Sequence, residues 1–326
     1  MNKKILIIIA AVLLAVILVV VIAVCAKRTP LPAYDASQDA LQATAIPDSS
    51  WGTRFTDQNA GVSLMAPKDF THVVKGGYET FIHQASEAYL QIQNLDYDPT
   101  VLTVDANTLG QSVQSSGGTL EDYQKISNTS YFFSYYLEGR HYEKLVLFDM
   151  DSVVVVEFCV PNDYLQVFNG MGDKVLNSVK YTPDNPFPAN YIIEYSDYGT
   201  FQYGVPEAWQ TSLENGVLYG ADPTTGAEMM LTVFEADITF DGYSQIDFVA
   251  DNSRDYSRYV CSSYYATANE LQAFGQYNFN GESRYLIQYL MISDGLVYQL
   301  YFTCPIDTYT NAQSTIDTIT SLFKLF

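Results

Sequence analysis

Residues 142–163 read YEKLVLFDMDSVVVVEFCVPND and hold the clearest fold signal in the 326-residue sequence. Residues 153–160 (VVVVEFCV) are rich in β-branched and aromatic side chains, which favour a strand. Residues 142–148 form a second hydrophobic run, and residues 149–152 (DMDS) between the two runs have the polar composition of a turn. The stretch therefore predicts an antiparallel β-hairpin.

This stretch has a counterpart 144 residues later in the chain. Residues 286–307 read LIQYLMISDGLVYQLYFTCPID, with an Asp-Gly pair that suits the positive φ of a tight hairpin turn. Identical residues recur at the same shift: Glu138 and Glu282, Arg140 and Arg284, Phe158 and Phe302, Pro161 and Pro305, Asp163 and Asp307, Lys180 and Lys324. Residues 61–70 (GVSLMAPKDF) and 200–209 (TFQYGVPEAW) match at a shift of 139. We therefore predict a tandem duplication with a small insertion in the middle of the second copy.

Proline marks the boundary between the copies. Residues 183–190 (PDNPFPAN) hold three prolines, which remove backbone donors and disfavour both a helix and a central strand. We predict one domain over residues 51–182, a linker over 183–190 and a second domain over 191–326. Residues 29–50 also contain three prolines and only scattered apolar side chains, as expected of a spacer.

Each copy combines strands with helices. Apolar residues at helical spacing predict a helix near the end of each copy, over residues 165–179 and 312–323. Earlier helices are expected near residues 103–115 and 243–254. Because strands precede and follow these helices, the predicted fold class is α+β, with an antiparallel sheet and packed helices in each of two similar domains.

Two elements of each copy resemble the PsbP-like family. The residues that carry the resemblance are Gly61, Pro67, Phe70, Pro161, Asp163 and Lys180 in the first copy, and Pro206, Trp209, Pro305, Asp307 and Lys324 in the second. Thr200 stands where the first copy has Gly61, which departs from the pattern. The resemblance implies an α/β/α sandwich around an antiparallel sheet, a fold that the family shares with a Ran-binding nuclear import factor. It implies little about activity, because the best-known members are non-catalytic accessory proteins of unrelated systems.

The N-terminal segment differs from the rest of the chain. Residues 5–25 form an unbroken apolar run with two basic residues on each side, and at 1.5 Å per residue a helix of this length reaches about 31 Å, enough to cross a bilayer core. We predict an uncleaved transmembrane helix within residues 1–28, with a cleaved signal peptide or lipidation at Cys25 as alternatives. The distribution of basic residues favours a single-pass cell-membrane protein with residues 29–326 outside the cytoplasm.

The chain is strongly acidic, with 16 Lys and Arg against 37 Asp and Glu and a formal charge of −21. This argues against nucleic acid as a partner, because such binding relies on basic side chains that displace counterions. Residues 51–182 contain 16 acidic and 8 basic side chains, and residues 190–326 contain 17 and 4. We therefore expect cations or basic protein surfaces as partners, above all for the second copy.

Carboxylate groups supply the candidates for a metal site. Asn94, Asp96 and Asp98 alternate along one segment, as the ligands of a weak calcium site do, and Asp237 and Asp241 occupy a comparable place in the second copy. Neither group has the glycine and bidentate glutamate of an EF-hand loop. Turn-forming residues at a strand end are therefore the alternative interpretation, and no other cofactor is expected.

The sequence contains no recognisable catalytic constellation. The three histidines form no metal-binding pair, and no serine stands in a nucleophile elbow. Glu138 and Arg140 stand two residues apart, so we expect them on one face of a strand, and His141 lies beside Arg140. The pair recurs as Glu282 and Arg284 in the second copy, but Tyr285 takes the place of His141. We therefore expect cross-strand ion pairing here rather than acid–base catalysis, and we predict that the protein is not an enzyme.

Strand alternation predicts where the cysteines lie. Cys304 shares the face of Phe302, whereas Cys159 lies on the face opposite to Phe158. We expect free buried thiols, with a Cys261–Cys304 disulfide as the one alternative.

These observations predict a membrane-anchored, extracytoplasmic, non-catalytic protein that binds another protein or scaffolds a complex of the cell envelope. The alternative is an envelope ligand-binding module for a glycan or calcium, suggested by 27 tyrosines and the excess of carboxylates. Most tyrosines should pack on the sheets, and a minority should form an exposed platform for sugar rings or protein side chains.

Overall fold

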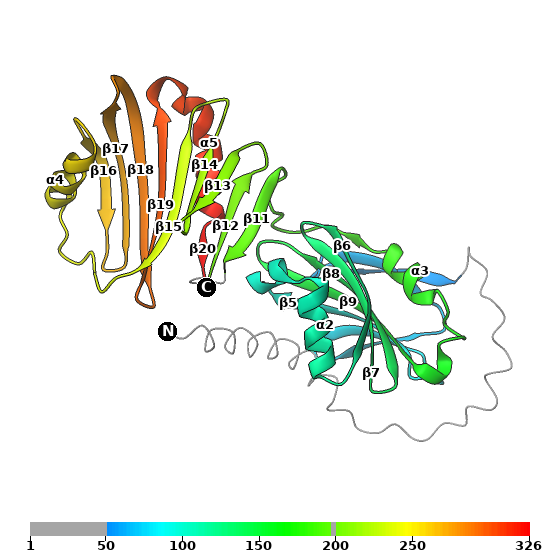
Figure 1. The fold of residues 1–326 in the computed structure, drawn as a ribbon. Coiled ribbons are helices and arrows are strands. Elements are labelled where there is room, and N and C mark those ends of the chain that lie inside the picture. Colours follow the sequence, from blue (N-terminus) through cyan, green and yellow to red (C-terminus); the bar gives the residue numbers. More distant parts are fainter. Residues whose placement is uncertain (1–50, 197–199) are drawn as a thin grey trace. The chain divides into compact units, whose positions relative to one another are not determined.

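The structure is a computed structural model that describes residues 51–196 and 200–326. The predicted anchor (residues 1–28) and spacer (29–50) lie outside the described residues. Within the described ranges, no helix has the length and apolar character needed to cross a membrane. The chain divides between Phe187 and Pro188 into two compact units, here called unit 1 and unit 2 (Figure 1).

Unit 1 is built on a seven-stranded antiparallel sheet. The strands lie side by side in the order β3 (Thr71–Lys75), β4 (Tyr78–Ile82), β5 (Tyr89–Asp96), β9 (Ser152–Pro161), β8 (Arg140–Phe148), β7 (Ser130–Leu137) and β6 (Thr119–Ser127). The predicted hairpin is the β8–β9 pair, in which Leu145 lies opposite Val156. Val156 and Phe158 face one hydrophobic cluster and Val155 and Cys159 face another, so this strand is buried on both sides.

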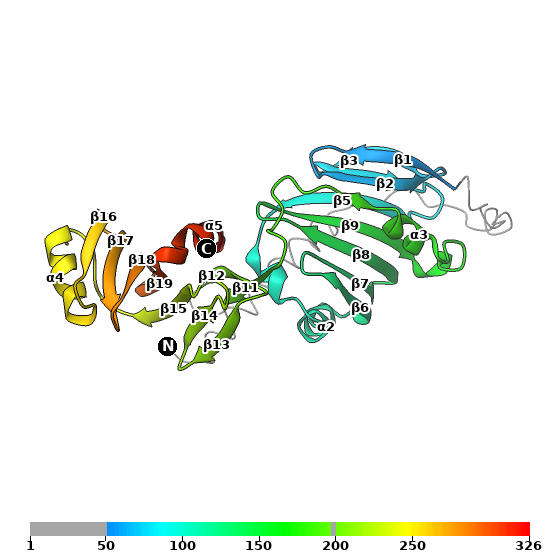
Figure 2. The same ribbon diagram turned by 90° about the horizontal axis from the view of Figure 1, so that it is seen from above.

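Different layers cover the two faces of this sheet. One face packs against α3 (Met171–Asn177), which follows η2 (Asn162–Tyr164), and against a small sheet of β1 (Gly52–Asp57), β2 (Val62–Pro67) and β10 (Lys180–Tyr181). The other face packs against η1 (Pro99–Thr103) and α2 (Ala106–Ser115), as Figure 2 shows edge-on. Unit 1 therefore has a helix on each face of its central sheet.

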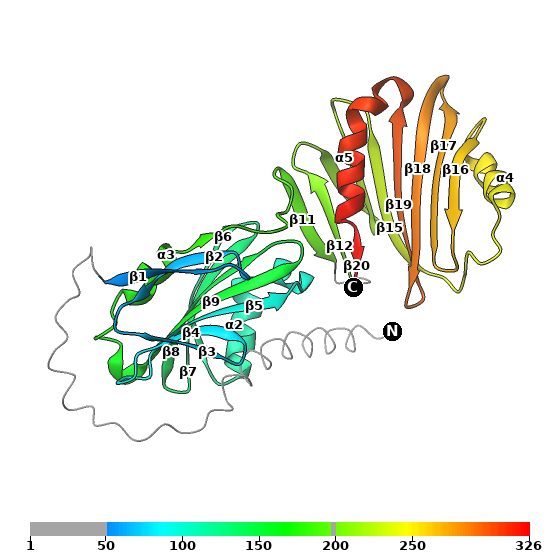
Figure 3. The ribbon, with the colours of Figure 1, turned by 180° about the vertical axis from the view of Figure 1, so that it is seen from behind.

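Unit 2 repeats this plan. Its seven strands follow the order β13 (Gln210–Glu214), β14 (Val217–Ala221), β15 (Glu228–Glu235), β19 (Leu296–Pro305), β18 (Glu282–Ser293), β17 (Glu270–Phe279) and β16 (Val260–Ala266). One face packs against α5 (Tyr309–Leu322), which follows η3 (Ile306–Thr308) and is seen in Figure 3, and against β11 (Tyr191–Ser196), β12 (Phe201–Pro206) and β20 (Lys324–Leu325). The helix α4 (Gln245–Asp255) lies on the other face.

The two units thus have the same strand order, as the internal repeat predicts. The additional residues of the second copy lie mainly in the β17–β18 hairpin. The facing pair Gln276 and Tyr285 encloses four more residues than the equivalent pair Tyr136 and His141 in unit 1. A longer hairpin tip leaves the rest of the sheet register unchanged.

Two local predictions were wrong. The helix expected over residues 165–179 begins only at Met171, because Gly170 has a positive φ of 69° that interrupts helical geometry. Glu138 does not share a strand face with Arg140, because it lies in the β7–β8 turn with a φ of 50°. Arg140 instead forms an ion pair with Glu87 at 3.2 Å. The helices expected near 103–115, 243–254 and 312–323 correspond to α2, α4 and α5.

Candidate functional site

Unit 2 has one sheet face that its helices cover only in part. The helix α4 packs at the β16–β17 end of this face, through a cluster that includes Phe248, Tyr259 and Leu271. The remaining surface, over β13, β14, β15 and β19, is here called the open face. Its central row is a ladder of residues paired across neighbouring strands, Ser212, Tyr219, Met230 and Tyr301, and the ladder continues to Gln288 on β18.

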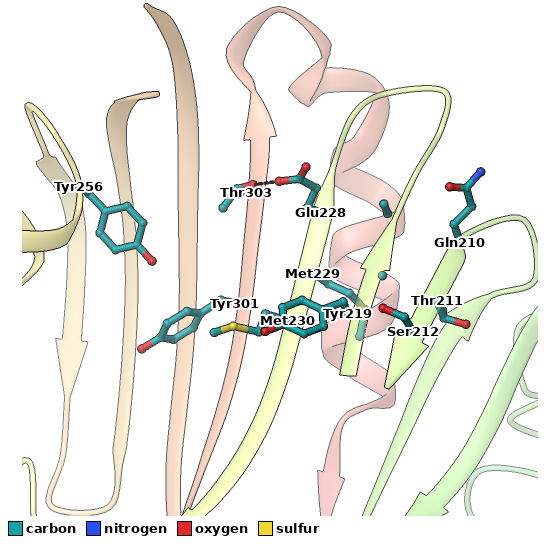
Figure 4. A pocket seen from close by; sticks show the side chains of 12 residues that line it. Gln210, Thr211, Ser212, Tyr219, Glu228, Met229, Met230, Tyr256, Tyr301 and Thr303 are labelled. Carbon is teal, nitrogen blue, oxygen red and sulfur yellow. Dashed lines mark hydrogen bonds between the residues drawn. The ribbon is translucent and has the colours of Figure 1, made fainter. Parts of the chain in front are cut away.

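The open face holds a cavity of about 580 Å³. Tyr219, Met230 and Tyr301 lie in a row across three strands, with Tyr256 nearby (Figure 4). Tyr219 is 40% exposed, a large fraction for an aromatic side chain on a strand that has neighbours on both sides. Aromatic and methionine side chains with polar neighbours are typical of protein-binding surfaces.

Tyr256 and Tyr301 keep their protons at neutral pH. Burial raises the pKa of Tyr256 to about 12, and the nearby Tyr301, Tyr277 and Asp255 add to this shift. Burial also raises the pKa of Tyr301; a side-chain hydrogen bond with Gln288 opposes this shift, and the charge of Asp255 adds to it. These hydroxyl groups are therefore neutral hydrogen-bonding groups and do not serve as bases.

The equivalent ladder in unit 1 is sealed. It consists of Val73, Thr80, Gln91, Glu157 and Lys144, and the last four residues are each no more than 8% exposed. Its polar groups contact one another within the chain. The ammonium of Lys144 lies 2.6 Å from a carboxylate oxygen of Glu157, and Gln91 donates a hydrogen bond of 3.0 Å to Thr80.

The difference between the ladders follows from the residues at equivalent positions. Where unit 1 has the ion pair of Lys144 with Glu157, unit 2 has the neutral residues Gln288 and Tyr301. Two neutral residues cannot form the strong mutual attraction that makes a buried charged pair tolerable. The ladder in unit 2 therefore lacks the internal ion pair that its counterpart has.

A second cavity of about 410 Å³ adjoins the first and shares Tyr256 and Tyr301 with it. It lies between α4 and the sheet, over the apolar residues Phe248, Leu271 and Leu290. The polar group at its base is Gln288, which is only 3% exposed. The side-chain oxygen Oε1 of Gln288 is buried without a hydrogen-bond partner.

The charged side chains that line the two cavities are all acidic. They are Glu228 in the larger cavity and Asp251 and Asp255 in the smaller one, and neither lining includes a basic residue. Glu228 is partly neutralised by Arg284 and Asp251 by Arg254, each at 3.2 Å. The site therefore favours a ligand that is cationic or rich in hydrogen-bond donors.

The predicted calcium ligands do not converge in this way. Asn94 donates a hydrogen bond to the backbone oxygen of Asn59, and Asp98 caps η1 by accepting from Thr100. Asp96 ends β5, and Asp237 and Asp241 are exposed in the segment before α4. Within the described ranges, no three His, Cys, Asp or Glu side chains come together as a metal site.

The histidines lie in unit 1, whereas the open face belongs to unit 2. His141 contacts Glu121 at 2.7 Å and Glu143 at 3.6 Å, so its ion-pair partners are these two glutamates and not Glu138. His72 contacts Glu79 at 2.5 Å, and His83 shares a hydrogen bond of 2.8 Å with Ser86.

The cysteines follow the predicted alternation. Cys159 packs in the cluster on the α2 side of its sheet and Cys304 in the cluster on the α5 side of the other sheet. The alternative Cys261–Cys304 disulfide is absent, and Cys159, Cys261 and Cys304 are all free thiols. Two strands, β18 and β17, separate Cys304 from Cys261, a span of about 14 Å that exceeds the reach of a disulfide.

Met230, Gln288 and Tyr301 were not among the site residues predicted from the sequence. The signal that identifies two of them is the internal alignment, which sets Gln288 against Lys144 and Tyr301 against Glu157. A charged pair in one copy that becomes a neutral pair in the other marks a position where the two copies differ in chemistry. Met230 carries no such signal, because a methionine in a strand reads as a packing residue.

Comparison with known proteins gives structural neighbours only. No family model and no curated protein matches the chain. The cyanobacterial PsbP (CyanoP) of Synechocystis sp. PCC 6803 is 14% identical, with a TM-score of 0.30 over 43% of this chain and 94% of that chain. The Saccharomyces cerevisiae Ran-binding protein Mog1p is 7% identical, with a TM-score of 0.32 over 42% of this chain and 95% of that chain. The immunity protein TplEi of T6SS from Pseudomonas aeruginosa is 11% identical, with a TM-score of 0.27 over 85% of this chain and 98% of that chain.

Proposed function

We propose that this chain is a membrane-anchored, extracytoplasmic, non-catalytic protein whose unit 2 binds a basic segment of a partner protein on the open face. Both units are proposed to be PsbP-like domains, each an α/β/α sandwich. The residues of the apolar run, 5–25, serve as the anchor in this proposal. Protease added to intact cells should then degrade the acidic units without prior membrane disruption.

One observation carries the proposal. The two units have the same topology but differ in the burial of the same sheet face. Unit 1 buries its ladder, whereas unit 2 leaves Tyr219, Met230 and Tyr301 accessible. A protein without a partner for such a surface gains nothing from exposing large apolar side chains at the centre of a sheet. The acidic lining and the net acidity of unit 2 favour a basic partner.

Site-specific photo-crosslinking tests this proposal. A benzophenone amino acid replaces Tyr219 in the full chain, expressed in the cells that produce the protein. The expected result is a discrete crosslinked protein, with a yield that falls when Glu228→Gln and Asp255→Asn are added. The fall is expected because both substitutions remove negative charge from the cavity linings.

The matched control places the same amino acid at Tyr265, which is 53% exposed on the edge strand β16. Tyr265 lines neither of the two cavities. The same products from both positions, or no product from Tyr219, would refute the open face as a binding surface.

A glycan is the second candidate ligand, because polar side chains adjoin an exposed aromatic ring. Gln210, Thr211 and Ser212 line the cavity beside Tyr219, and sugars combine hydroxyl groups with apolar ring faces. Soluble fragments of the producer's own cell wall should then shift the NMR signal of the Met230 methyl group in the full chain. A Met230 signal that stays in place at millimolar fragment concentrations removes this candidate.

A further inference from the structure

The smaller cavity, between α4 and the sheet, contains a polar group that the protein itself does not satisfy. Gln288 is 3% exposed, and among the residues that the structure describes its Oε1 atom has no hydrogen-bond partner. Buried polar atoms almost always have a partner, and a buried acceptor without a donor lowers stability. A ligand that brings a donor to this atom would gain the hydrogen bond without first breaking another.

Unit 1 shows which donor this ladder position accommodates. The equivalent residue there is Lys144, whose ammonium contacts Glu157 at 2.6 Å and lies 5.6 Å from the centre of the Tyr135 ring. In unit 1 the chain therefore supplies a buried ammonium group from its own sequence. In unit 2 an acceptor stands at the same position, and no basic side chain lines the cavity around it.

The other walls of the cavity also suit an alkylammonium group. Asp255 lines the same cavity as Gln288, so the cavity offers a carboxylate as well as the buried amide. The rings of these tyrosines and the apolar floor of Leu271 and Leu290 offer contact for a methylene chain. Aromatic faces attract cations, and a lysine side chain buries its methylenes while its ammonium keeps polar partners.

We propose that this cavity is a lysine-binding pocket, which receives the ammonium group of a lysine side chain from the partner segment. Gln288 Oε1 and Asp255 accept hydrogen bonds from the ammonium group, and Tyr256 and Tyr301 flank the methylene chain. This inference rests on the proposed function and adds the side chain that anchors the partner in unit 2.

NMR titration of the full chain tests the pocket separately from the partner. The chain carries labelled methyl groups on leucine and methionine, so that Leu271 and Leu290 report on the pocket. The probe is Nα-acetyl-lysine N-methylamide, and its matched control is the norleucine derivative, which lacks the ammonium group. The lysine probe should shift the leucine signals with a dissociation constant on the order of 1 mM, and the control should bind at least about tenfold more weakly.

Two variants test the named acceptors. Gln288→Met and Asp255→Asn should each weaken the lysine probe about tenfold, because each removes an acceptor for a charged donor. Gln288→Lys gives unit 2 the residue of unit 1 and should abolish binding, since its own ammonium fills the pocket. The control Asp237→Asn, at an exposed acid outside the cavity, should leave the affinity unchanged. Unchanged leucine and methionine signals outside the pocket confirm that each variant is folded.

The outcomes distinguish the pocket from the proposed function. Equal binding of the lysine and norleucine probes, or equal binding by the wild-type chain and the Gln288→Met and Asp255→Asn variants, overturns the lysine pocket. If crosslinking from Tyr219 succeeds in that case, the proposed function stands without the pocket. Selective lysine binding supports the pocket even where no crosslinked partner is found, and the proposed function then fails alone.

Discussion

At the scale of single residues, the carboxyl group of Glu143 in unit 1 has an environment that disfavours its charged form. Its side chain packs against Gly172 so closely that a β-carbon at that glycine would overlap the carboxylate. One of its oxygens, Oε2, is buried without a hydrogen-bond partner. Burial raises the pKa of Glu143 to about 7, and the negative charges of Asp173 and Glu121 add to the shift.

This shift predicts a specific pH dependence of stability. Between pH 4.5 and about 7 the folded state keeps a proton on Glu143 that the unfolded state has released. The free energy of unfolding of unit 1 should therefore fall as the pH rises through this window, by up to about 3 kcal/mol. In Glu143→Gln this contribution is absent, so urea denaturation at pH 5 and pH 8 should show a smaller difference than in the wild type. An equal difference in both proteins would show that Glu143 is already ionised at pH 5.

Gly61 and Thr200 occupy equivalent positions in the two copies, and their surroundings explain why the residues differ. Both residues have a positive φ, of 61° and 49°. A β-carbon at Gly61 would overlap the carbonyl oxygen of Thr182. In unit 2 the hydroxyl of Thr200 instead donates a hydrogen bond of 3.1 Å to the carbonyl oxygen of Phe326, and the backbone N–H of Phe326 donates to the carbonyl oxygen of Thr200.

We therefore expect the reciprocal substitutions to differ in cost. Gly61→Thr should lower the free energy of unfolding of unit 1 by more than about 2 kcal/mol, because Thr182 is fixed by its bond to Gly61 and by Pro183. Thr200→Gly should change the stability of unit 2 by less than about 1 kcal/mol, because relief of the positive φ offsets the lost hydrogen bond. Urea denaturation with unit-specific methyl signals measures both, and equal costs would refute this account.

At the scale of elements, the two copies use the same devices with different residues. The helices α2 and α4 both begin with a capping box, formed by Asp105 with Thr108 in unit 1 and by Ser244 with Asp247 in unit 2. The aligned cap residues differ in type, yet each side chain accepts a hydrogen bond from the backbone three residues later. The starts of these two helices were therefore predictable from sequence to within a few residues, because the capping signal is local.

Removal of either cap should have a similar effect. Asp105→Ala and Ser244→Ala should each lower the free energy of unfolding of their own unit by about 1 kcal/mol, because one backbone N–H at the helix start loses its acceptor. Thermal or urea denaturation of the full chain is the measurement. The reference is Asp237→Asn, an exposed acid just before α4 that caps no helix.

At the scale of the whole molecule, the buried pair of Lys144 and Glu157 is the feature that separates unit 1 from unit 2. Both side chains are almost completely inaccessible, at 5% and 0% exposure. The hydroxyl of Tyr89 also donates to Glu157, at 2.5 Å. A buried carboxylate that loses its counter-charge keeps the cost of desolvation without the compensating attraction.

Lys144→Met should therefore lower the free energy of unfolding of unit 1 by about 3–5 kcal/mol, and the added substitution Glu157→Leu should recover most of this loss. The matched change in unit 2 is Gln288→Met, which should be neutral or slightly stabilising, because it removes an acceptor that has no partner. Urea denaturation with unit-specific methyl signals compares the two. A similar loss in both units would mean that the ladders differ less than their residues indicate.

The sequence by itself determined the duplication, the hairpins and the class of fold. Alternating apolar residues, turn glycines and caps act over a few residues, so they specify strands and helices without knowledge of the rest of the chain. The same alternation correctly assigned Cys159 and Cys304 to opposite kinds of face. It failed for α3, where a single residue, Gly170, interrupts an otherwise helical pattern.

Only the tertiary structure decided which sheet face is open. The exposure of Tyr219 and the unpartnered oxygen of Gln288 depend on where α4 packs, at one end of a sheet whose strands are far apart in sequence. Burial is a property of the assembled layers, and no local pattern distinguishes a tyrosine that packs in the core from one that stays accessible on a sheet face. The chain encodes two copies of one fold, and the packing around each sheet makes one of them a candidate binding unit.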